Sequence, residues 1–154
     1  MSSLKDQIQS DLTEAIKGKD QLRAGTLRMV LAAITNEEVS GKEAKTLNDQ
    51  ELMTVLNREA KKRKEASVAY VDAKRQDLAD KENAELAVIQ SYLPEALSAD
   101  ALAKIISDAV NEVKASGQSG PSAMGAVMKH VTPQVTGRAD GGQVAAAVKA
   151  ALAN

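Results

Sequence analysis

The chain has 154 residues, of which 44% are hydrophobic and 27% charged, and its formal net charge is -1. This is typical of a soluble protein with one moderate core or two small ones. The absence of cysteine excludes a disulfide framework, a thiolate metal site and a cysteine nucleophile. The start of the chain has no apolar signal-peptide segment, and the longest apolar run, residues 29–34, is far shorter than the roughly 20 residues of a membrane span. We therefore expect a cytoplasmic protein with no membrane partner.

Aromatic residues are nearly missing, since the chain has no Phe and no Trp and its two tyrosines are Tyr70 and Tyr92. The core must consist of Leu, Ile, Val, Met and Ala, which favours closely packed helices over a β-sandwich. No stretch shows convincing strand alternation, so the sequence predicts an all-α fold. A reader of single-stranded RNA that stacks bases on aromatic rings is also disfavoured.

Four helices are predicted in the N-terminal half, over about residues 4–17, 21–39, 48–75 and 77–92. Ser3 and Asp6 have the spacing of a capping box at the start of the first helix, and Asn48 and Glu51 have it at the start of the third. The second helix is apolar nearly all round in its middle, so we expect it to be the central helix of this half.

The third helix carries a basic cluster within residues 57–67, where no large apolar side chain occurs. This part is expected to project from the bundle or to present only small residues to a neighbour. Its candidate nucleic-acid-binding residues are Lys61, Lys62 and Arg63. A charge run on a long helix is also typical of a solvated face, and the acids within residues 72–85 partly neutralise this one. Arg23 and Arg28 on the second helix also allow two interpretations. They are either solvated or paired with acids such as Glu37, or they belong to a surface that faces phosphates.

Pro94 marks the boundary between two helical units. It ends the fourth helix, and Ser98 is placed to cap the next one. We therefore predict an N-terminal helical domain over residues 1–95, a bundle of about four helices, and a small three-helix C-terminal domain over residues 96–154. The helix after Ser98 has the cleanest amphipathic pattern in the chain.

Two short helices joined by a tight corner make up residues 120–152. The first begins at Pro121 and carries on one face Met124, Val127, Met128 and Val131. Pro133 is predicted to end this helix, and Gly137 to permit a sharp turn. Asp140 followed by Gln143 gives a start resembling a capping box to the last helix, whose apolar positions are Val144, Val148, Ala151 and Leu152.

This C-terminal stretch is basic, with four Lys or Arg from Lys114 to the end against one acid, Asp140. Lys129 and Arg138 lie at or beside the corner, and Lys149 lies on the last helix. Free amide groups at a helix N-terminus could add donors for a phosphate, but an N-capping Asp140 would occupy one of them and repel the phosphate. A phosphate contact should therefore depend on Lys129 and Arg138 first and on Lys149 second.

Catalytic chemistry has little support in the sequence. The single histidine, His130, lies near a helix end, where capping and surface roles are more common than catalysis. No GxxxxGK[ST] phosphate loop occurs, and Ser116 and Ser119 have no general base nearby in the sequence. We therefore expect no catalytic residue, no metal site and no cofactor.

Four ordered segments resemble the GatB/YqeY family, which comprises the tail of the B subunit of the tRNA-dependent amidotransferase and stand-alone YqeY-like proteins. They are LRAGTLRMVLAAITNEEV, IQSYLPEALS, MGAVMK and GRADGGQVAAAVK. The resemblance implies a helical tail that engages tRNA. It carries over Lys129 and Arg138 as phosphate contacts, with the backbone shaped by Gly125, Gly137 and Asp140. The chain lacks a counterpart of the amidotransferase's catalytic cradle, so a carbon–nitrogen ligase activity would be a label inherited from the family.

Two functions remain open at this point. The first is a non-catalytic module that binds tRNA or assists tRNA-dependent amidation, with an aminoacyl-tRNA synthetase or an amidotransferase component as a possible further partner and no DNA. The second is a helical adaptor that binds a protein component of translation or aminoacylation. Salt dependence separates the two, because phosphate contacts weaken steeply as salt rises, whereas an apolar helix interface does not.

Overall fold

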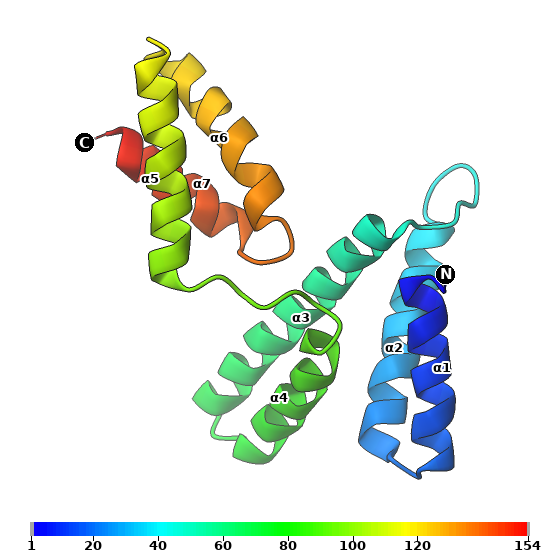
Figure 1. The fold of residues 1–154 in the computed structure, drawn as a ribbon. Coiled ribbons are helices and arrows are strands. Elements are labelled where there is room, and N and C mark those ends of the chain that lie inside the picture. Colours follow the sequence, from blue (N-terminus) through cyan, green and yellow to red (C-terminus); the bar gives the residue numbers. More distant parts are fainter. Residues whose placement is uncertain (1, 154) are drawn as a thin grey trace. The chain divides into compact units, whose positions relative to one another are not determined.

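A computed structural model describes residues 2–153 of the protein. Within this range it contains seven α-helices and no β-strand, which confirms the predicted all-α fold (Figure 1). The chain divides into two compact units, Met1–Pro94 and Glu95–Asn154. The first unit contains α1 (Leu4–Lys17), α2 (Gln21–Glu38), α3 (Asp49–Asp72) and α4 (Gln76–Gln90), and the second contains α5 (Ala99–Ala115), α6 (Pro121–Val135) and α7 (Gly141–Leu152). In the described range, no helix has both the length and the apolar character that crossing a bilayer requires.

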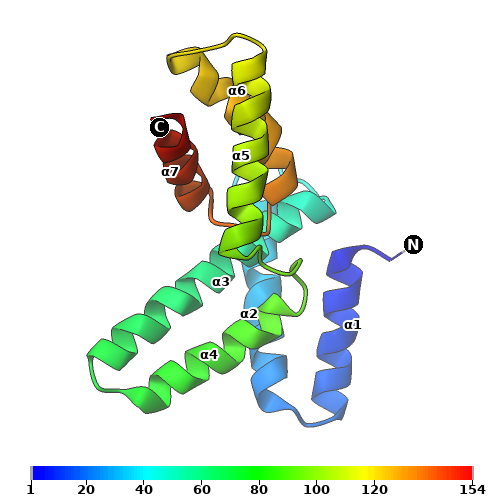
Figure 2. The ribbon, with the colours of Figure 1, turned by 60° about the vertical axis from the view of Figure 1, so that its left-hand side comes forward.

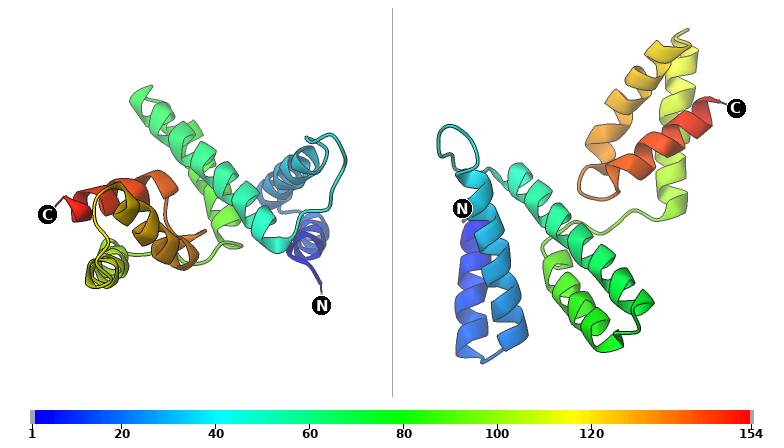
Figure 3. Two further views of the ribbon diagram at one scale, coloured as in Figure 1. Left: turned by 90° about the horizontal axis from the view of Figure 1, so that it is seen from above. Right: turned by 180° about the vertical axis from the view of Figure 1, so that it is seen from behind.

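The first unit consists of two helical hairpins, α1 with α2 and α3 with α4 (Figure 2). Two further views show the same pairs side by side (Figure 3). The helix α2 contacts each of the other three helices, as expected of a central helix. The shared core draws its fully buried side chains from all four helices: Ile8, Leu27, Ile34, Leu52, Leu56 and Ile89.

The helices α1 and α3 begin at the capping residues that the sequence predicts. Ser3 and Asp6 form a complete capping box at α1, and Asn48 and Glu51 form another at α3. These side chains satisfy amide groups that have no partner within the helix. The helix α3 ends at Asp72, slightly earlier than expected, because Lys74 takes a left-handed conformation with φ 60°.

The second unit is a three-helix assembly in which α5 contacts both α6 and α7, and α6 contacts α7. Its core is separate from that of the first unit and includes Ile106, Val110, Val127, Val131, Val144 and Val148. Met124 and Met128 are half-buried and pack against this core. Their packing agrees with the apolar face expected for α6.

The prediction that Pro133 ends a helix was wrong, since α6 continues to Val135 with Pro133 inside it. A proline removes one amide donor and crowds the preceding turn, which usually breaks a helix interior. Here it lies in the last turn, and Val135 behind it is buried in the core of the unit. The Thr136 amide still donates to the Thr132 carbonyl oxygen at 3.1 Å, so the turn closes around the proline.

A fragment of residues 95–154 is expected to remain helical on its own, because it contains a complete core. The fragment should begin at Glu95, whose carbonyl oxygen accepts a hydrogen bond from Arg138. A core of this size supplies about 3–5 kcal/mol of stability at most, so a low melting temperature is expected. Circular dichroism checks this, and a random-coil spectrum at 10 °C would show that the fragment cannot fold alone.

Candidate nucleic-acid interface

The outer face of α6 presents Lys129 to solvent. Val127 and Val131 are fully buried, and each residue turns an α-helix by about 100°. Lys129, two residues after Val127, therefore projects from the side opposite the core and is exposed. Helix packing alone thus fixes the outward direction of this cation.

Gly125 lies one turn before Lys129 on the same outer face of α6. A methyl group added at Gly125 would meet no atom within 4 Å other than those of its neighbouring residues and its own helix backbone. Glycine in a helix interior costs about 1 kcal/mol relative to alanine, and the chain's own packing offers no reason for it here. A bare backbone next to a lysine allows a bulky anionic group to approach the helix closely.

Arg138 anchors the corner between α6 and α7. Its backbone nitrogen donates to the Val135 carbonyl oxygen at 2.8 Å, and its carbonyl oxygen accepts from the Leu97 amide at 2.9 Å. Its side-chain Nε donates to the Glu95 carbonyl oxygen at 3.3 Å. Gly137 takes φ 77°, a left-handed conformation that favours glycine, and so turns the chain into this position. The guanidinium is thus held by backbone while its side chain stays exposed.

Asp140 caps α7 as expected, its carboxylate accepting from the Gln143 amide at 3.1 Å. Lys149 is exposed beside the buried Val148 of the same helix. Neither α6 nor α7 contains an acidic residue. Within residues 2–153, Lys129, Arg138 and Lys149 form no salt bridge with a carboxylate, unlike most cations of α3.

The basic cluster of α3 divides into exposed and buried members. Lys61, Lys62 and Lys64 are exposed, and Lys62 forms an ion pair of 2.8 Å with Glu59. This part of α3 was expected to project or to present only small residues to a neighbour, and the small Ala60 is indeed buried, but so is Arg63. It therefore cannot reach a phosphate while the unit is folded, and we remove it from the candidate surface.

Arg63 lies between two buried carboxylates, Glu59 on α3 and Glu85 on α4. Its Nη1 donates to Glu59 Oε2 at 3.0 Å and to the Glu59 carbonyl oxygen at 3.1 Å. Its Nε lies 3.3 Å from Glu85 Oε2 but makes no hydrogen bond within the described residues. Burial raises the pKa of Glu59, but hydrogen bonds from Lys62 and Arg63 outweigh it and hold that pKa below its usual range.

A second polar cluster joins α1, α2 and the turn that follows α4. The Tyr92 hydroxyl donates to Asp11 Oδ2 at 2.5 Å and accepts from Arg23 Nη2 at 3.3 Å. Burial first and the Asp11 carboxylate second raise the pKa of Tyr92 to about 12. Arg23 therefore pairs with Asp11 within the first unit. Glu37, the partner suggested for it by the sequence, pairs with Arg58 at 3.1 Å. Sequence reasoning missed this cluster because its members are far apart along the chain.

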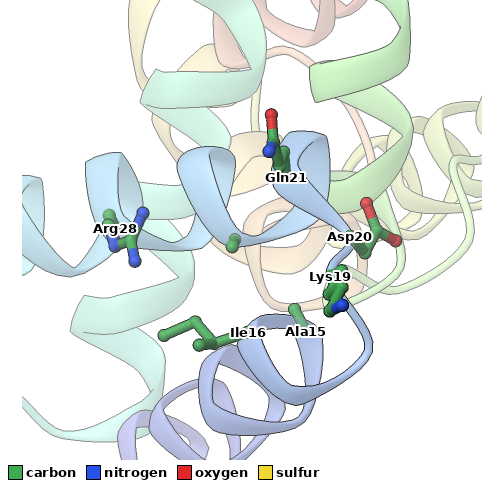
Figure 4. A pocket seen from close by; sticks show the side chains of 7 residues that line it. Ala15, Ile16, Lys19, Asp20, Gln21 and Arg28 are labelled. Atoms are coloured by element: carbon green, nitrogen blue, oxygen red, sulfur yellow. The ribbon is translucent and has the colours of Figure 1, made fainter.

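The hairpin of α1 and α2 contains a shallow pocket of about 530 Å³ (Figure 4). Ile16 projects from α1 and Arg28 lies on α2, while Lys19 and Asp20 belong to the connecting turn (Figure 4). The Asp20 carboxylate accepts the Arg23 amide at 3.0 Å as an N-cap. Within the described residues, no group of three or more His, Cys, Asp or Glu side chains could hold a metal ion.

Comparison with known proteins places the chain among proteins of one family. The family model of YqeY-like proteins matches residues 5–152. The chain is similar to altered inheritance of mitochondria protein 41 of Vanderwaltozyma polyspora, with 35% identity over 86 residues, 56% of the chain and 46% of the relative. The same-named protein of Lachancea thermotolerans shares 32% over 118 residues, 75% of the chain and 60% of the relative. That of Clavispora lusitaniae shares 30% over 132 residues, 84% of the chain and 74% of the relative.

The chain spans about half the length of several of the curated relatives that it matches, including that of Vanderwaltozyma polyspora. These relatives are named as mitochondrial proteins, so the cytoplasmic location expected for this chain stays a prediction. The family match runs from the start of α1 to the end of α7 and so covers both helical units. On this match, the chain belongs to the YqeY-like family.

Proposed function

We propose that the protein is a non-catalytic helical module that binds tRNA through the outer face of α6 and the α6–α7 corner. The observation that carries the proposal is the combination of Gly125 and Lys129 one helical turn apart on a face that the core does not use. Arg138 adds a guanidinium fixed by the Glu95 carbonyl oxygen. The likeness of this stretch to the tail of the amidotransferase B subunit supports tRNA as the ligand and tRNA-dependent amidation as the setting.

The chemistry of this surface suits phosphate recognition more than base reading. Lysine and arginine at exposed positions contact phosphates through charge and carry little sequence information. Residues 121–140 include no Phe, Tyr or Trp, and the ring that they carry is the exposed imidazole of His130. Binding should therefore depend on tRNA shape and charge, with similar affinity for different tRNA sequences.

The test is a tRNA-binding titration over a series of salt concentrations. Changing Lys129→Ala together with Arg138→Ala should reduce the slope of log affinity against log salt by about 1.4 to 1.8, since each phosphate contact contributes roughly 0.7 to 0.9. The matched control is Lys17→Ala with Lys104→Ala, which also removes two exposed cations, each from a surface ion pair. The control should leave the slope unchanged.

A third variant locates the site. Lys61→Ala, Lys62→Ala and Lys64→Ala together remove the three exposed lysines of α3 and leave the exposed Arg58 and the buried Arg63 in place. A loss confined to this variant would move the interface to α3. Undetectable tRNA binding by the folded wild-type chain at low salt would refute the proposal for the chain alone.

One observation, at the C-terminal end of α3, favours the adaptor function. Val68 and Val71 are exposed there, and Lys64 precedes Val68 by one turn. Such a mixed apolar and basic surface suits an acidic protein partner. Binding that persists at high salt and is lost in Val68→Ser with Val71→Ser would favour this second function.

A further inference from the structure

Three of the exposed large apolar side chains of the first unit lie on one helix, α2, or at its C-cap. They are Leu22, Met29 and Val39, with exposed fractions of 40%, 43% and 59%. Gly25, Ala32 and Asn36 fall between them on the same side. The six residues follow one another at alternating steps of three and four, which is the 3.5-residue repeat of a coiled-coil seam. We call them the α2 seam.

The core of the first unit does not use the α2 seam. The side of α2 that packs inside the unit carries Leu27, Val30 and Ile34, all buried. On the outer side, a methyl group added at Gly25 would meet no atom within 4 Å other than those of its neighbouring residues and its own helix backbone. Glycine lowers helix stability, and the fold of one copy gives no reason for it at this position. A second helix that approaches α2 closely would supply that reason.

We propose that the α2 seam pairs with the α2 seam of a second copy of this chain, antiparallel and about a two-fold axis. The two-fold axis crosses the seam between Met29 and Ala32. This register opposes Met29 to Ala32, Asn36 to Gly25 and Leu22 to Val39, so that every layer sets a larger side chain against a smaller one. A parallel pair would oppose Gly25 to Gly25 and Ala32 to Ala32, which leaves gaps at both layers.

The size of the contact agrees with a reversible dimer. An 18-residue helix such as α2 is about 27 Å long, and two such helices packed along a seam bury on the order of 1,000 Å² in total. That area is near the lower limit for a specific interface. The seam itself contains no charged residue, so no unpaired charge is buried by pairing. Arg28 at its edge would lie close to Thr35 of the second copy.

Met29 is already positioned for this role. Arg63 Nη2 lies 3.7 Å from the Met29 sulfur, and the salt bridges of Arg63 to Glu59 and Glu85 fix the guanidinium. The central layer of the proposed dimer is thus supported from inside the unit. The exposed pair Val68 and Val71 on α3 is not part of a longer apolar seam like that of α2. Pairing through these two residues would bury too little surface to hold two copies together.

Cysteine crosslinking tests the register directly, because the natural chain has no cysteine. Met29→Cys and Ala32→Cys variants of the 154-residue chain are mixed in a glutathione redox buffer. The antiparallel seam predicts a disulfide dimer that joins residue 29 of one variant to residue 32 of the other. Gln9→Cys on the exposed side of α1 is the control and should not crosslink. Dimers that join residue 29 to residue 29 would overturn the antiparallel register.

Sedimentation of chains without introduced cysteine completes the test. The wild type should show a concentration-dependent dimer in the micromolar range, and Ala32→Glu should weaken that dimer at least tenfold. Ala87→Glu, an equal change at an exposed position of α4, should leave it unchanged. A wild type that sediments as a monomer at several hundred micromolar would overturn the proposal, as would equal dimerisation of wild type and Ala32→Glu.

Discussion

Replacing Arg63 by alanine should lower the free energy of unfolding of the first unit by about 3–5 kcal/mol, the loss expected when one partner of a buried ion pair is removed. The change would leave two buried carboxylates, Glu59 and Glu85, without the guanidinium that lies between them. Lys62 could compensate Glu59 only in part, since it contacts that carboxylate from the solvent side. Urea denaturation at pH 7 measures the effect.

Two comparisons separate charge from packing in this prediction. Arg58→Ala breaks a half-exposed ion pair with Glu37 and should cost no more than about 1 kcal/mol. A triple replacement of Glu59, Arg63 and Glu85 by Leu, Met and Leu should cost far less than Arg63→Ala, because no buried charge is left unpaired. If Arg63→Ala cost as little as Arg58→Ala, the buried cluster would not have the energetic role described here.

Acid should destabilise the first unit through Glu59. The folded pKa of this carboxyl lies below its ordinary value of 4.5, so the unfolded chain binds the proton more readily than the folded one. The stability contributed by Glu59 is therefore fully present above about pH 4.5. It is lost as the pH falls below that value and through the lowered pKa of the folded state.

The Glu59→Gln variant isolates this contribution from other carboxylates with lowered pKa values, such as Glu38 and Glu51. Its side chain keeps a similar shape but cannot titrate, so its stability should fall less steeply between pH 5 and pH 3 than that of the wild type. Urea denaturation at several pH values gives both curves. Parallel curves for the two proteins would mean that the Glu59 carboxyl has the same pKa in the folded and unfolded states.

Local sequence signals predicted most helix boundaries, because caps and apolar spacing act within a few residues. Ser3 with Asp6 and Asn48 with Glu51 form the expected capping boxes. The failure at Pro133 shows the limit of such rules, since tertiary packing of Val135 overrides the helix-breaking tendency of a proline in the last turn.

The main error of the sequence-based prediction for the first unit was to treat Arg63 as an exposed residue. Residues 57–67 contain no large apolar side chain, so local composition indicated a solvated helix. The signal that could have corrected this is the helical spacing of Leu52, Leu56, Glu59 and Arg63, which continues the apolar stripe into the polar stretch. Its partner Glu85 lies on α4, and no local pattern joins it to Arg63.

The candidate interface was only partly predictable. The outward direction of Lys129 follows from its position two residues after Val127, which local spacing gives directly. The anchoring of Arg138 depends on the Glu95 carbonyl oxygen, 43 residues away, and the sequence contains no sign of that contact. A long-range hydrogen bond to a backbone atom leaves no mark in the composition or periodicity of the sequence, so it cannot be recognised there.

The most direct test of the proposed interface is a heteronuclear NMR titration of the 16.2 kDa chain, labelled with nitrogen-15, with deacylated tRNA. If tRNA binds at this interface, the strongest changes in amide signals will occur in residues 122–138, with a weaker change at Lys149. Residues 57–67 of α3 should change little. Changes confined to α3, or no change at all at equimolar tRNA in low salt, would contradict the assignment of the interface to α6 and its corner.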